Sequence, residues 1–506
     1  MVASTETMPA GRKMLFGHPI GLYTLFFTEM WERASYYGNR ALLVLFLVDA
    51  INNHRGGLGI TTENATAIYG LYTGCVYLMT LVGGWVADRL LGQQRSVWYG
   101  GIFIALGNAI LAIPAGGLPL VFVGLTVIIL GTGLLKPNVS VIVGQLYPEG
   151  GVSRDSGFSI FYSGINLGAF LGPIFASYFG ERYNWHYGFL VASIGMLLGL
   201  FQYRLMRPYL GGAGLTAYHS GDASRDAVVR RRGWQTVGGG LLALVVIAFL
   251  LDIGALRFDI VWLASAISVF IFALAVAYFA YVLRFGGLDA TEKKQVVVIF
   301  LLFLGAAVFW SGFEQAGSSL NIFAADYTRR TFFGFEIPAG WFQIINPWFI
   351  IILAPVFGHL WVVLARRNLN PSVPLKFGLG LVQLGLGFLV MVFAAKVAVT
   401  GDKALPTWLI ITYLLHTTAE LCLSPVGLSA VTKLAPARYL SQMMGTWFLA
   451  DSLGSVMAGL AAGRFNPQDL HEMPRLFLQI VYITVGAGIL FFIFSKPMRK
   501  LIGNVQ

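Results

Sequence analysis

The stretch Glu29–Tyr37, which reads Glu-Met-Trp-Glu-Arg-Ala-Ser-Tyr-Tyr, lies inside an apolar run that extends from about residue 19 to residue 48. It contains three ionisable residues, Glu29, Glu32 and Arg33. Residues three and four apart share one face of a helix, so these three side chains point the same way. A charge near the middle of a membrane-spanning helix costs about 2.5–3.5 kcal/mol on insertion scales. The stretch therefore predicts a polar cavity, or partners for these charges, inside a membrane.

The composition of the whole chain also indicates a membrane protein. Of its 506 residues, 57% are hydrophobic and 11% are charged, whereas a soluble protein carries about 25% charged residues. The 61 glycines suit membrane helices, in which small residues let backbones approach closely. Cys75 and Cys422 fall within expected spans and are interpreted as small core residues. The first apolar run is too long for a secretory signal.

We expect an all-α integral membrane protein with fourteen spans. Most of them exceed the roughly 20 residues that a bilayer requires. With the N-terminus inside, most of the 34 Lys and Arg residues lie on the cytoplasmic side, which places both termini in the cytoplasm. The expected spans are 20–48, 64–87, 97–115, 119–145, 157–179, 186–205, 234–252, 259–283, 295–316, 341–364, 377–396, 406–431, 440–462 and 475–495.

The net charge of +11 follows this topology and gives no reason to expect a nucleic-acid partner. The most basic loop contains Arg225 and Arg230–Arg232. We interpret it as a topology signal beside membrane lipids, and a specific lipid site is the alternative.

A weak internal repeat divides the chain into two halves. Pro137 and Pro148 have the same spacing as Pro425 and Pro436, and two further short matches occur at nearly the same offset. Parallel repeats of this kind are typical of the major facilitator fold, whose substrate site lies near the midplane between the halves. We therefore expect six-helix bundles at residues 1–206 and 294–506. A basic cytoplasmic linker and two lipid-facing accessory helices would occupy residues 207–293.

Ionisable residues inside the expected spans can pair across the two halves. At 1.5 Å of rise per residue, Glu29 and Lys136 each lie roughly 13 Å from the inner ends of their spans, so they could pair with each other. Lys136 could also face Glu420 of the other half. Arg40 and Glu314 lie nearer the outer side and could form a second cross-half pair. One breakable pair on each side of the midplane suits alternating access, whereas static pairing that holds helices together is the alternative.

Such pairs would also couple transport to protons. A carboxylate beside Arg or Lys keeps its charge, whereas an unpaired carboxylate in a low dielectric favours its protonated form. A substrate carboxylate that replaced Glu29 or Glu32 beside a cation would release that side chain for protonation. The sequence thus suggests a link between substrate binding and proton binding.

Five motifs, taken in order, resemble those of the proton-dependent oligopeptide transporters. The first is Glu29-x-x-Glu32-Arg33 followed by Tyr36-Tyr37. The other four are Lys136-Pro137-Asn138, Phe161-Tyr162-x-x-Ile165-Asn166-x-Gly168, Trp310…Glu314-Gln315 and Glu420-Leu421-x-x-Ser424-Pro425. The resemblance covers essentially the whole chain, including the two central helices of bacterial members. It implies proton-driven symport of di- and tripeptides across the bacterial inner membrane.

The resemblance also implies roles for individual residues. The expected proton-coupling residues are Glu29, Glu32, Arg33 and Glu314, and the expected gating pairs are Arg40–Glu314 outside and Lys136–Glu420 inside. Arg33 and Lys136 would hold the peptide carboxylate, while Glu420, Asn166 and Asn346 would hold its amino terminus. Core packing is the alternative for each aromatic residue. The expected substrate-binding residues are Arg33, Tyr36, Tyr37, Arg40, Tyr77, Lys136, Asn166, Trp310, Asn346, Glu420, Ser424 and Trp447.

The sequence departs from the family pattern in three places. Ala34 stands where the first motif usually continues with Phe, and Gly70 stands where animal members carry a proton-linked His. His416 and Asp451, one helical turn from Glu420 and from Trp447 respectively, are unexpected. Either one of them tunes the proton affinity of Glu420, or they are polar contacts within the bundle.

Other functions fit the sequence less well. The same fold could carry nitrate or a drug-like peptide mimic, but Lys136 and Glu420 together favour a zwitterion. An enzyme would need a nucleophile–base pair or metal ligands, and the seven His are scattered. The two-half repeat argues against a channel, and the chain has no P-loop, so a gradient must supply the energy. We expect a monomer with no cofactor, no metal and no enzymatic activity.

Overall fold

The computed structural model describes residues 13–149, 151–215, 222–257, 259–464 and 470–502. Within these residues the chain forms fourteen helices of 19 residues or more, so the expected all-α membrane fold is confirmed. Eleven helices are long and apolar enough to cross a membrane by length and composition. The other three long helices are more polar or more highly charged, and one of them carries the Glu29–Tyr37 stretch.

The long helices fall into three groups along the chain. The first group is α1 (Ile20–Val48), α2 (Thr62–Val86), α3 (Gln93–Leu111), α4 (Gly117–Gln145), α5 (Gly151–Arg182) and α6 (Trp185–Met206). The central pair is α7 (Ala223–Asp252) and α8 (Ile260–Phe285). The last group is α9 (Ala290–Phe313), α11 (Ile345–Arg366), α12 (Val373–Val399), α13 (Pro406–Leu434), α14 (Leu440–Gly463) and α15 (Met473–Ile502).

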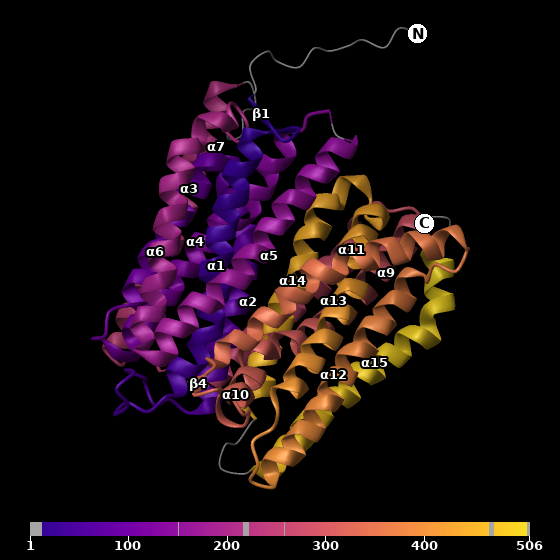
Figure 1. Cartoon of the computed structure of the whole chain (residues 1–506). Coiled ribbons are helices and arrows are strands. Elements are labelled where there is room, and N and C mark those ends of the chain that lie inside the picture. Colours follow the sequence, from indigo (N-terminus) through magenta and orange to yellow (C-terminus); the bar gives the residue numbers. More distant parts are fainter. Residues whose placement is uncertain (1–12, 150, 216–221, 258, 465–469, 503–506) are drawn as a thin grey trace.

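Short elements connect these helices. The 3₁₀ segment η3 (Glu314–Gly317) and the short helix α10 (Ser319–Asp326) follow α9, and η4 (Ala339–Ile344) leads into α11. Two antiparallel hairpins, β1 (Met14–Leu15) with β2 (His18–Pro19) and β3 (Thr331–Phe332) with β4 (Phe335–Glu336), lie at opposite ends of the molecule (Figure 1). The remaining segments are the π-helical η1 (Ala87–Leu91) and the 3₁₀ segments η2 (Arg207–Leu210), η5 (Ala437–Tyr439) and η6 (Leu470–Glu472).

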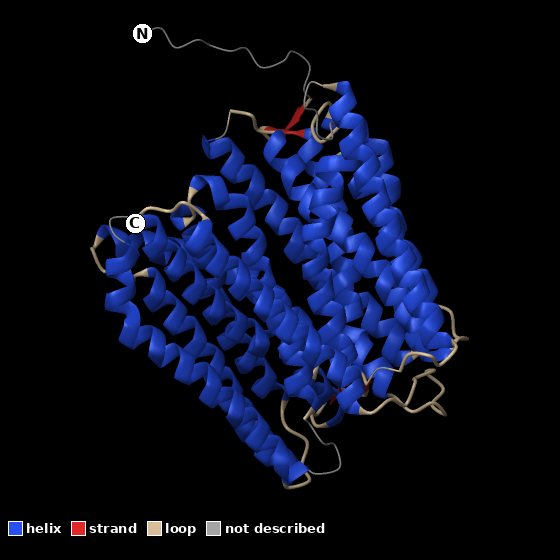
Figure 2. Cartoon of the chain, turned by 180° about the vertical axis from the view of Figure 1, so that it is seen from behind, coloured by secondary structure: helices blue, strands red, loops and turns tan. Residues whose placement is uncertain are grey.

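The helices gather into two bundles. Figure 1 shows α1–α6, from indigo to magenta, beside the orange and yellow helices of the last group, and Figure 2 shows the same two groups from behind. Within the bundles α1 packs on α5 and α12 packs on α15, while α2 and α14 join one bundle to the other. The boundaries 1–206, 207–293 and 294–506 stay predictions, and the two chain ends lie outside the described residues.

The central pair of helices lies at the edge of this assembly. Only 6% of the apolar window of α7 and 17% of that of α8 are buried inside the protein. α8 packs on α14 and α2. This exposure agrees with the expectation that both are accessory helices that face lipid.

The observed helices correct the expected spans at their ends. α5 begins at residue 151 rather than 157, α7 at 223 rather than 234, and α15 continues to 502 rather than 495. Hydropathy marks only the apolar part of a helix, whereas the hydrogen-bonded backbone continues into polar residues. The expected span 295–316 is also wrong at its end, because α9 stops at Phe313 and the chain turns through η3 before α10. A Cβ atom on Gly317 would lie 2.1 Å from the Tyr69 hydroxyl, so a glycine is required at this break.

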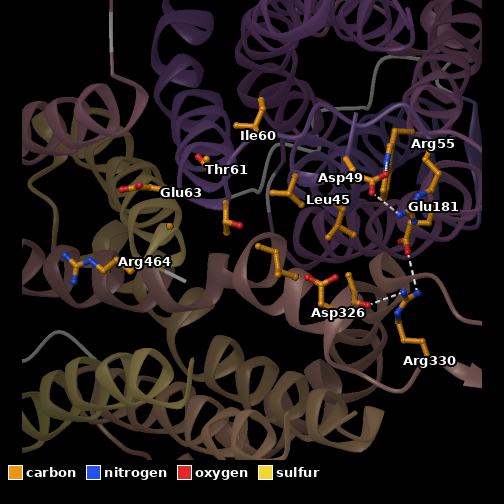
Figure 3. A pocket seen from close by; sticks show the side chains of 17 residues that line it. Leu45, Asp49, Arg55, Ile60, Thr61, Glu63, Glu181, Asp326, Arg330 and Arg464 are labelled. Carbon is orange, nitrogen blue, oxygen red and sulfur yellow. Dashed lines mark hydrogen bonds and ion pairs between the residues drawn. The ribbon is translucent and has the colours of Figure 1, made fainter. Parts of the chain in front are cut away.

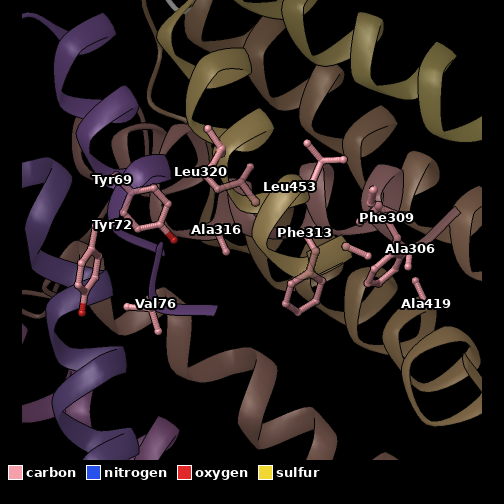
Figure 4. Close-up of a cluster of buried hydrophobic side chains, with 14 of the residues drawn as sticks. Tyr69, Tyr72, Val76, Ala306, Phe309, Phe313, Ala316, Leu320, Ala419 and Leu453 are labelled. Carbon is pink, nitrogen blue, oxygen red and sulfur yellow. The ribbon is translucent and has the colours of Figure 1, made fainter. Parts of the chain in front are cut away.

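Buried apolar side chains fill the space between the bundles near this break. Figure 4 shows Tyr69, Tyr72 and Val76 on α2 facing Ala316 and Leu320 of the second half. These side chains belong to one buried cluster that extends through both halves. The end of α9, where the helix is interrupted by η3, therefore packs against α2.

The helix that carries the Glu29–Tyr37 stretch packs very closely on α5. Cβ atoms on Gly164, Gly168 and Gly172 would lie 2.9, 2.2 and 2.1 Å from the carbonyl oxygens of Phe26, Met30 and Ala34. Three glycines, each separated by one turn, thus let the two backbones touch along the stretch.

We expect Gly172→Ala to destabilise the protein by about 1–3 kcal/mol, because the added methyl group would collide with the rigid backbone of α1. The matched control is Gly238→Ala on α7, where a Cβ atom meets nothing within 4 Å. Thermal unfolding of both purified variants in detergent measures the difference. Equal unfolding midpoints for Gly172→Ala and wild type would contradict the close packing.

Candidate functional site

The three charges of the opening stretch lie together, buried, on α1. Glu29, Glu32 and Arg33 are 2%, 1% and 3% exposed. Arg33 pairs with Glu32 through two nitrogens, and its Nη2 lies 2.6 Å from Glu32 Oε1. Glu29 Oε1 lies 3.5 Å from Arg33 Nε, while Glu29 Oε2 is buried without a hydrogen-bond partner. One cation thus serves two carboxylates, and Glu29 is the less firmly held of the two.

Lys136 lies on α4, in the same half of the molecule. Its ammonium group sits 4.1 Å from the centroid of the Tyr77 ring, close enough for a cation–π interaction. It forms no ion pair with Glu29 or with Glu420, both of which are described residues. The expected Glu29–Lys136 and Lys136–Glu420 pairs are therefore not formed in this structure.

Arg40 and Glu314 form the expected pair between the two halves. Arg40 Nη2 lies 3.4 Å from Glu314 Oε2, and both side chains are about 5% exposed. Tyr69 bridges them, because its hydroxyl accepts from Arg40 Nε at 3.1 Å and donates to Glu314 Oε2 at 3.2 Å. Tyr69 was not predicted as a site residue from the sequence, although Gly70, which follows it, marks a departure from the family motif.

Glu420 lies on α13 of the second half and is held by Asn346. The Asn346 side-chain amide donates to Glu420 Oε2 at 3.1 Å and to Thr417 Oγ1 at 3.0 Å. Thr417 was not assigned by sequence reasoning, although it precedes Glu420 by one turn. Asn166, expected beside Glu420, instead donates to the carbonyl of Tyr162 on its own helix. Ser424 is partly exposed one turn beyond Glu420.

The aromatic residues named from the sequence lie near these charges. The Tyr36 ring lies 4.7 Å from the Arg33 guanidinium, and the Tyr37 ring 5.6 Å from that of Arg40. Trp310 packs against Phe309 and Phe313, and Trp447 packs against Phe377. The two tyrosines therefore contact site cations, whereas core packing accounts for the observed ring contacts of the two tryptophans.

His416 and Asp451 have different surroundings. His416 is 1% exposed and lies beside the Phe388 ring, which favours a contact within the bundle. Asp451 Oδ1 is buried without a hydrogen-bond partner. Among the described residues, no cluster of three or more His, Cys, Asp or Glu side chains could hold a metal ion.

The polar contacts between the halves gather at one end of the molecule. We call the end at which α1 and α5 finish the outer end; it is the lower end in Figure 1. Besides the Arg40–Glu314 pair, Asn321 donates to the Ala41 carbonyl and Trp341 to that of Ile174. Ser452 donates to the Gly74 carbonyl near the middle of both helices. Among the described residues, no hydrogen bond joins the halves nearer the inner end, so of the two expected pairs between the halves, Arg40–Glu314 is formed and Lys136–Glu420 is not.

The comparisons with known proteins agree with this architecture. The sequence profile of the POT family matches residues 94–210 and 259–474. The peptide transporter YePEPT of Yersinia enterocolitica subsp. palearctica is 42% identical over 511 residues, with 99% of each chain covered. A di-/tripeptide transporter of Lactococcus lactis subsp. cremoris is 38% identical over 503 residues, with 98% of each covered. A crystal structure of peptide transporter POT in complex with sulfate matches 97% of each chain, with a TM-score of 0.87 and 39% identity.

Two bundles of membrane helices with buried charges between them define a multi-pass membrane transporter of the major facilitator type. The chain belongs to the POT family.

We expect Tyr69→Phe to lower stability by about 1–3 kcal/mol, because the buried Arg40 and Glu314 would each lose a partner. Tyr36→Phe is the matched control, since the Tyr36 hydroxyl is buried without a hydrogen-bond partner. Thermal unfolding in detergent compares the two variants. A larger loss in Tyr36→Phe than in Tyr69→Phe would argue against the bridging role.

Proposed function

We propose that this protein is a proton-coupled symporter that imports di- and tripeptides by alternating access across a bacterial inner membrane. The observation that carries the proposal is the separation of charge between the halves. Arg33 and Lys136 supply cations on the first half, and Glu420 supplies a carboxylate on the second. A zwitterionic peptide needs both signs of charge at opposite ends of its site. The names of the relatives in Yersinia and Lactococcus support the same substrate class.

Exchange of partners at Arg33 explains how protons are coupled. The carboxylate of an entering peptide competes with Glu29 and Glu32 for the Arg33 guanidinium. Glu29 is already the weaker partner, at 3.5 Å with one oxygen unpaired. A carboxylate released from Arg33 in this buried position favours its protonated form. Peptide binding and proton uptake therefore support each other.

The second half receives the amino terminus of the peptide. Asn346 occupies Glu420 Oε2, and Glu420 Oε1 is available to accept from an ammonium group. Thr417 fixes the Asn346 side chain, so the carboxylate is oriented before the peptide arrives. Preorganisation of this kind lowers the cost of ordering the site on binding.

The closed Arg40–Glu314 pair and the absent Lys136–Glu420 pair correspond to a form that opens toward the inside, from which peptide and proton would leave. We place the inner end and both chain termini in the cytoplasm, because the positive-inside rule favours that orientation. The exposed faces of α7 and α8 would contact lipid, and the protein would work as a monomer without a cofactor.

We expect Glu32→Gln to abolish proton-driven accumulation of dialanine in proteoliposomes while peptide exchange across the membrane continues. The amide keeps the size of the side chain but neither pairs ionically with Arg33 nor exchanges a proton. Uptake with and without an inward proton gradient measures both properties, and the wild type without a gradient is the control. Absence of dialanine flux in the wild type under either condition would overturn the substrate assignment.

We expect Glu420→Gln to weaken inhibition of uptake by free dialanine about tenfold or more, because a charged partner of the ammonium group is lost. N-acetyl-dialanine has no ammonium group, so its weaker inhibition should be the same in wild type and variant. Competition curves for both compounds give the ratio. A similar change for the two compounds would show that Glu420 does not recognise the amino terminus.

A further inference from the structure

Glu181 joins the two halves at the outer end. It is the next-to-last residue of α5, and its side chain is 7% exposed. Its carboxylate accepts the backbone N–H of Ala339 at 2.7 Å and that of Gly340 at 2.9 Å. Both residues begin η4, which continues into α11 of the second half. A side chain of one half thus binds the main chain of the other with both oxygens.

These two hydrogen bonds satisfy backbone N–H groups at the start of the helical segment formed by η4 and α11. The first N–H groups of a helix have no partner within it, and the helix dipole favours negative charge there. Pro338, which precedes η4, makes no side-chain capping bond. Glu181 therefore caps this helix from the opposite half, and bonds of this kind to a carboxylate are stronger than neutral ones.

Arg330 stabilises the hairpin that precedes η4. Its Nη1 lies 3.7 Å from Glu181 Oε2. The same guanidinium donates to the carbonyls of Ile337 at 2.7 Å and Ala325 at 3.2 Å, and it pairs with Glu336 at 2.9 Å. The hairpin before η4 is thereby held so that the two N–H groups point at Glu181.

The fit between η4 and the first half is close. A Cβ atom on Gly340 would lie 2.0 Å from Ser177 Oγ and 3.0 Å from Ala41 Cβ. The next residue, Trp341, donates its indole N–H to the Ile174 carbonyl at 3.0 Å. The Glu181 bonds can form only while these surfaces touch, so they break when the outer ends separate.

A cavity of about 720 Å³ adjoins these bonds at the outer end. Figure 3 shows Glu181 and Arg330 at its edge, with Asp49 and Arg55 nearby. Its wall comes from both halves and carries charges of both signs. Water in such a cavity can solvate the separated groups, which makes a strong contact reversible.

We propose that the bonds from Glu181 to Ala339 and Gly340 form a latch that sets the ratio of molecules closed at the outer end to molecules open there. The inference rests on the proposed function, because this ratio matters only to a transporter that alternates. The latch differs from the Arg40–Glu314 pair, which joins two side chains deeper in the molecule. Because the partners on the second half are main-chain N–H groups, the strength of the latch depends on the Glu181 carboxylate.

Distances between spin labels test the latch directly. Labels at Asn52→Cys and Asp402→Cys, two exposed positions in outer loops of different halves, report separation of the outer ends. Cys75→Ser and Cys422→Ser remove the native thiols. In lipid nanodiscs, Glu181→Ala should raise the ratio of long to short distances about tenfold, as expected for loss of hydrogen bonds to a charged group.

Two further variants make the outcome decisive. Gly340→Ala should change the distances in the same direction, because its methyl group would keep η4 off α5. Glu336→Ala should leave them unchanged, because the Glu336 side chain that pairs with Arg330 is 54% exposed and such exposed pairs contribute little. Arg330 keeps its bonds to the Ile337 and Ala325 carbonyls. Unchanged distances in both Glu181→Ala and Gly340→Ala, in monodisperse protein, would overturn the latch. Because the distances require no peptide flux, a failed uptake assay with shifted distances would reject the substrate and keep the latch.

Discussion

The pairing of Arg33 with Glu32 is the interaction on which the rest of the structure depends. A guanidinium that is 3% exposed on a membrane helix is tolerable only beside carboxylates, and removal of one partner from a buried pair is far more costly than the pair itself is favourable. The glycines of α5 pack closely on α1 along this stretch, with Gly168 against the Cβ of Arg33, so the Arg33 guanidinium finds its carboxylate partners on its own helix. The same close packing favours movement of α1 and α5 together.

The two halves are tied by contacts of two kinds. The Arg40–Tyr69–Glu314 group joins side chains in a buried layer, where few water molecules can replace a lost partner. Glu181 joins a side chain to a helix start beside a large cavity. Breaking the first group leaves charges poorly solvated, whereas breaking the second exposes groups that water can satisfy. An order of opening that begins at the rim and proceeds inward follows from this difference in solvation.

The sequence predicts the membrane fold and the opening cluster because both rest on local patterns. Composition marks the helices, and spacing along one helix places Glu29, Glu32 and Arg33 together. The Arg40–Glu314 pair followed from depth alone. Tyr69 and Glu181 were missed for different reasons: Tyr69 resembles any core aromatic residue, and Glu181 stands beside Arg182 at a helix end, where charges normally face solvent. Formation of the Lys136–Glu420 pair depends on which ends of the two halves are in contact. The sequence alone does not specify which ends these are.

The buried charged groups that lack a partner distinguish between two interpretations, charges that pair permanently to hold helices together and charges that exchange partners. If the buried charges only held helices together, each would be expected to have a partner. A buried charge or polar group without a partner destabilises the fold. Lys136 instead rests on the Tyr77 ring, and Glu29 Oε2 and Asp451 Oδ1 have no hydrogen-bond partner. Arg33 and the Arg40–Glu314 group are well paired at the same time. Ion pairs that hold the outer end closed, together with buried charges below it that lack a full set of partners, are what a site that binds and releases charged cargo requires.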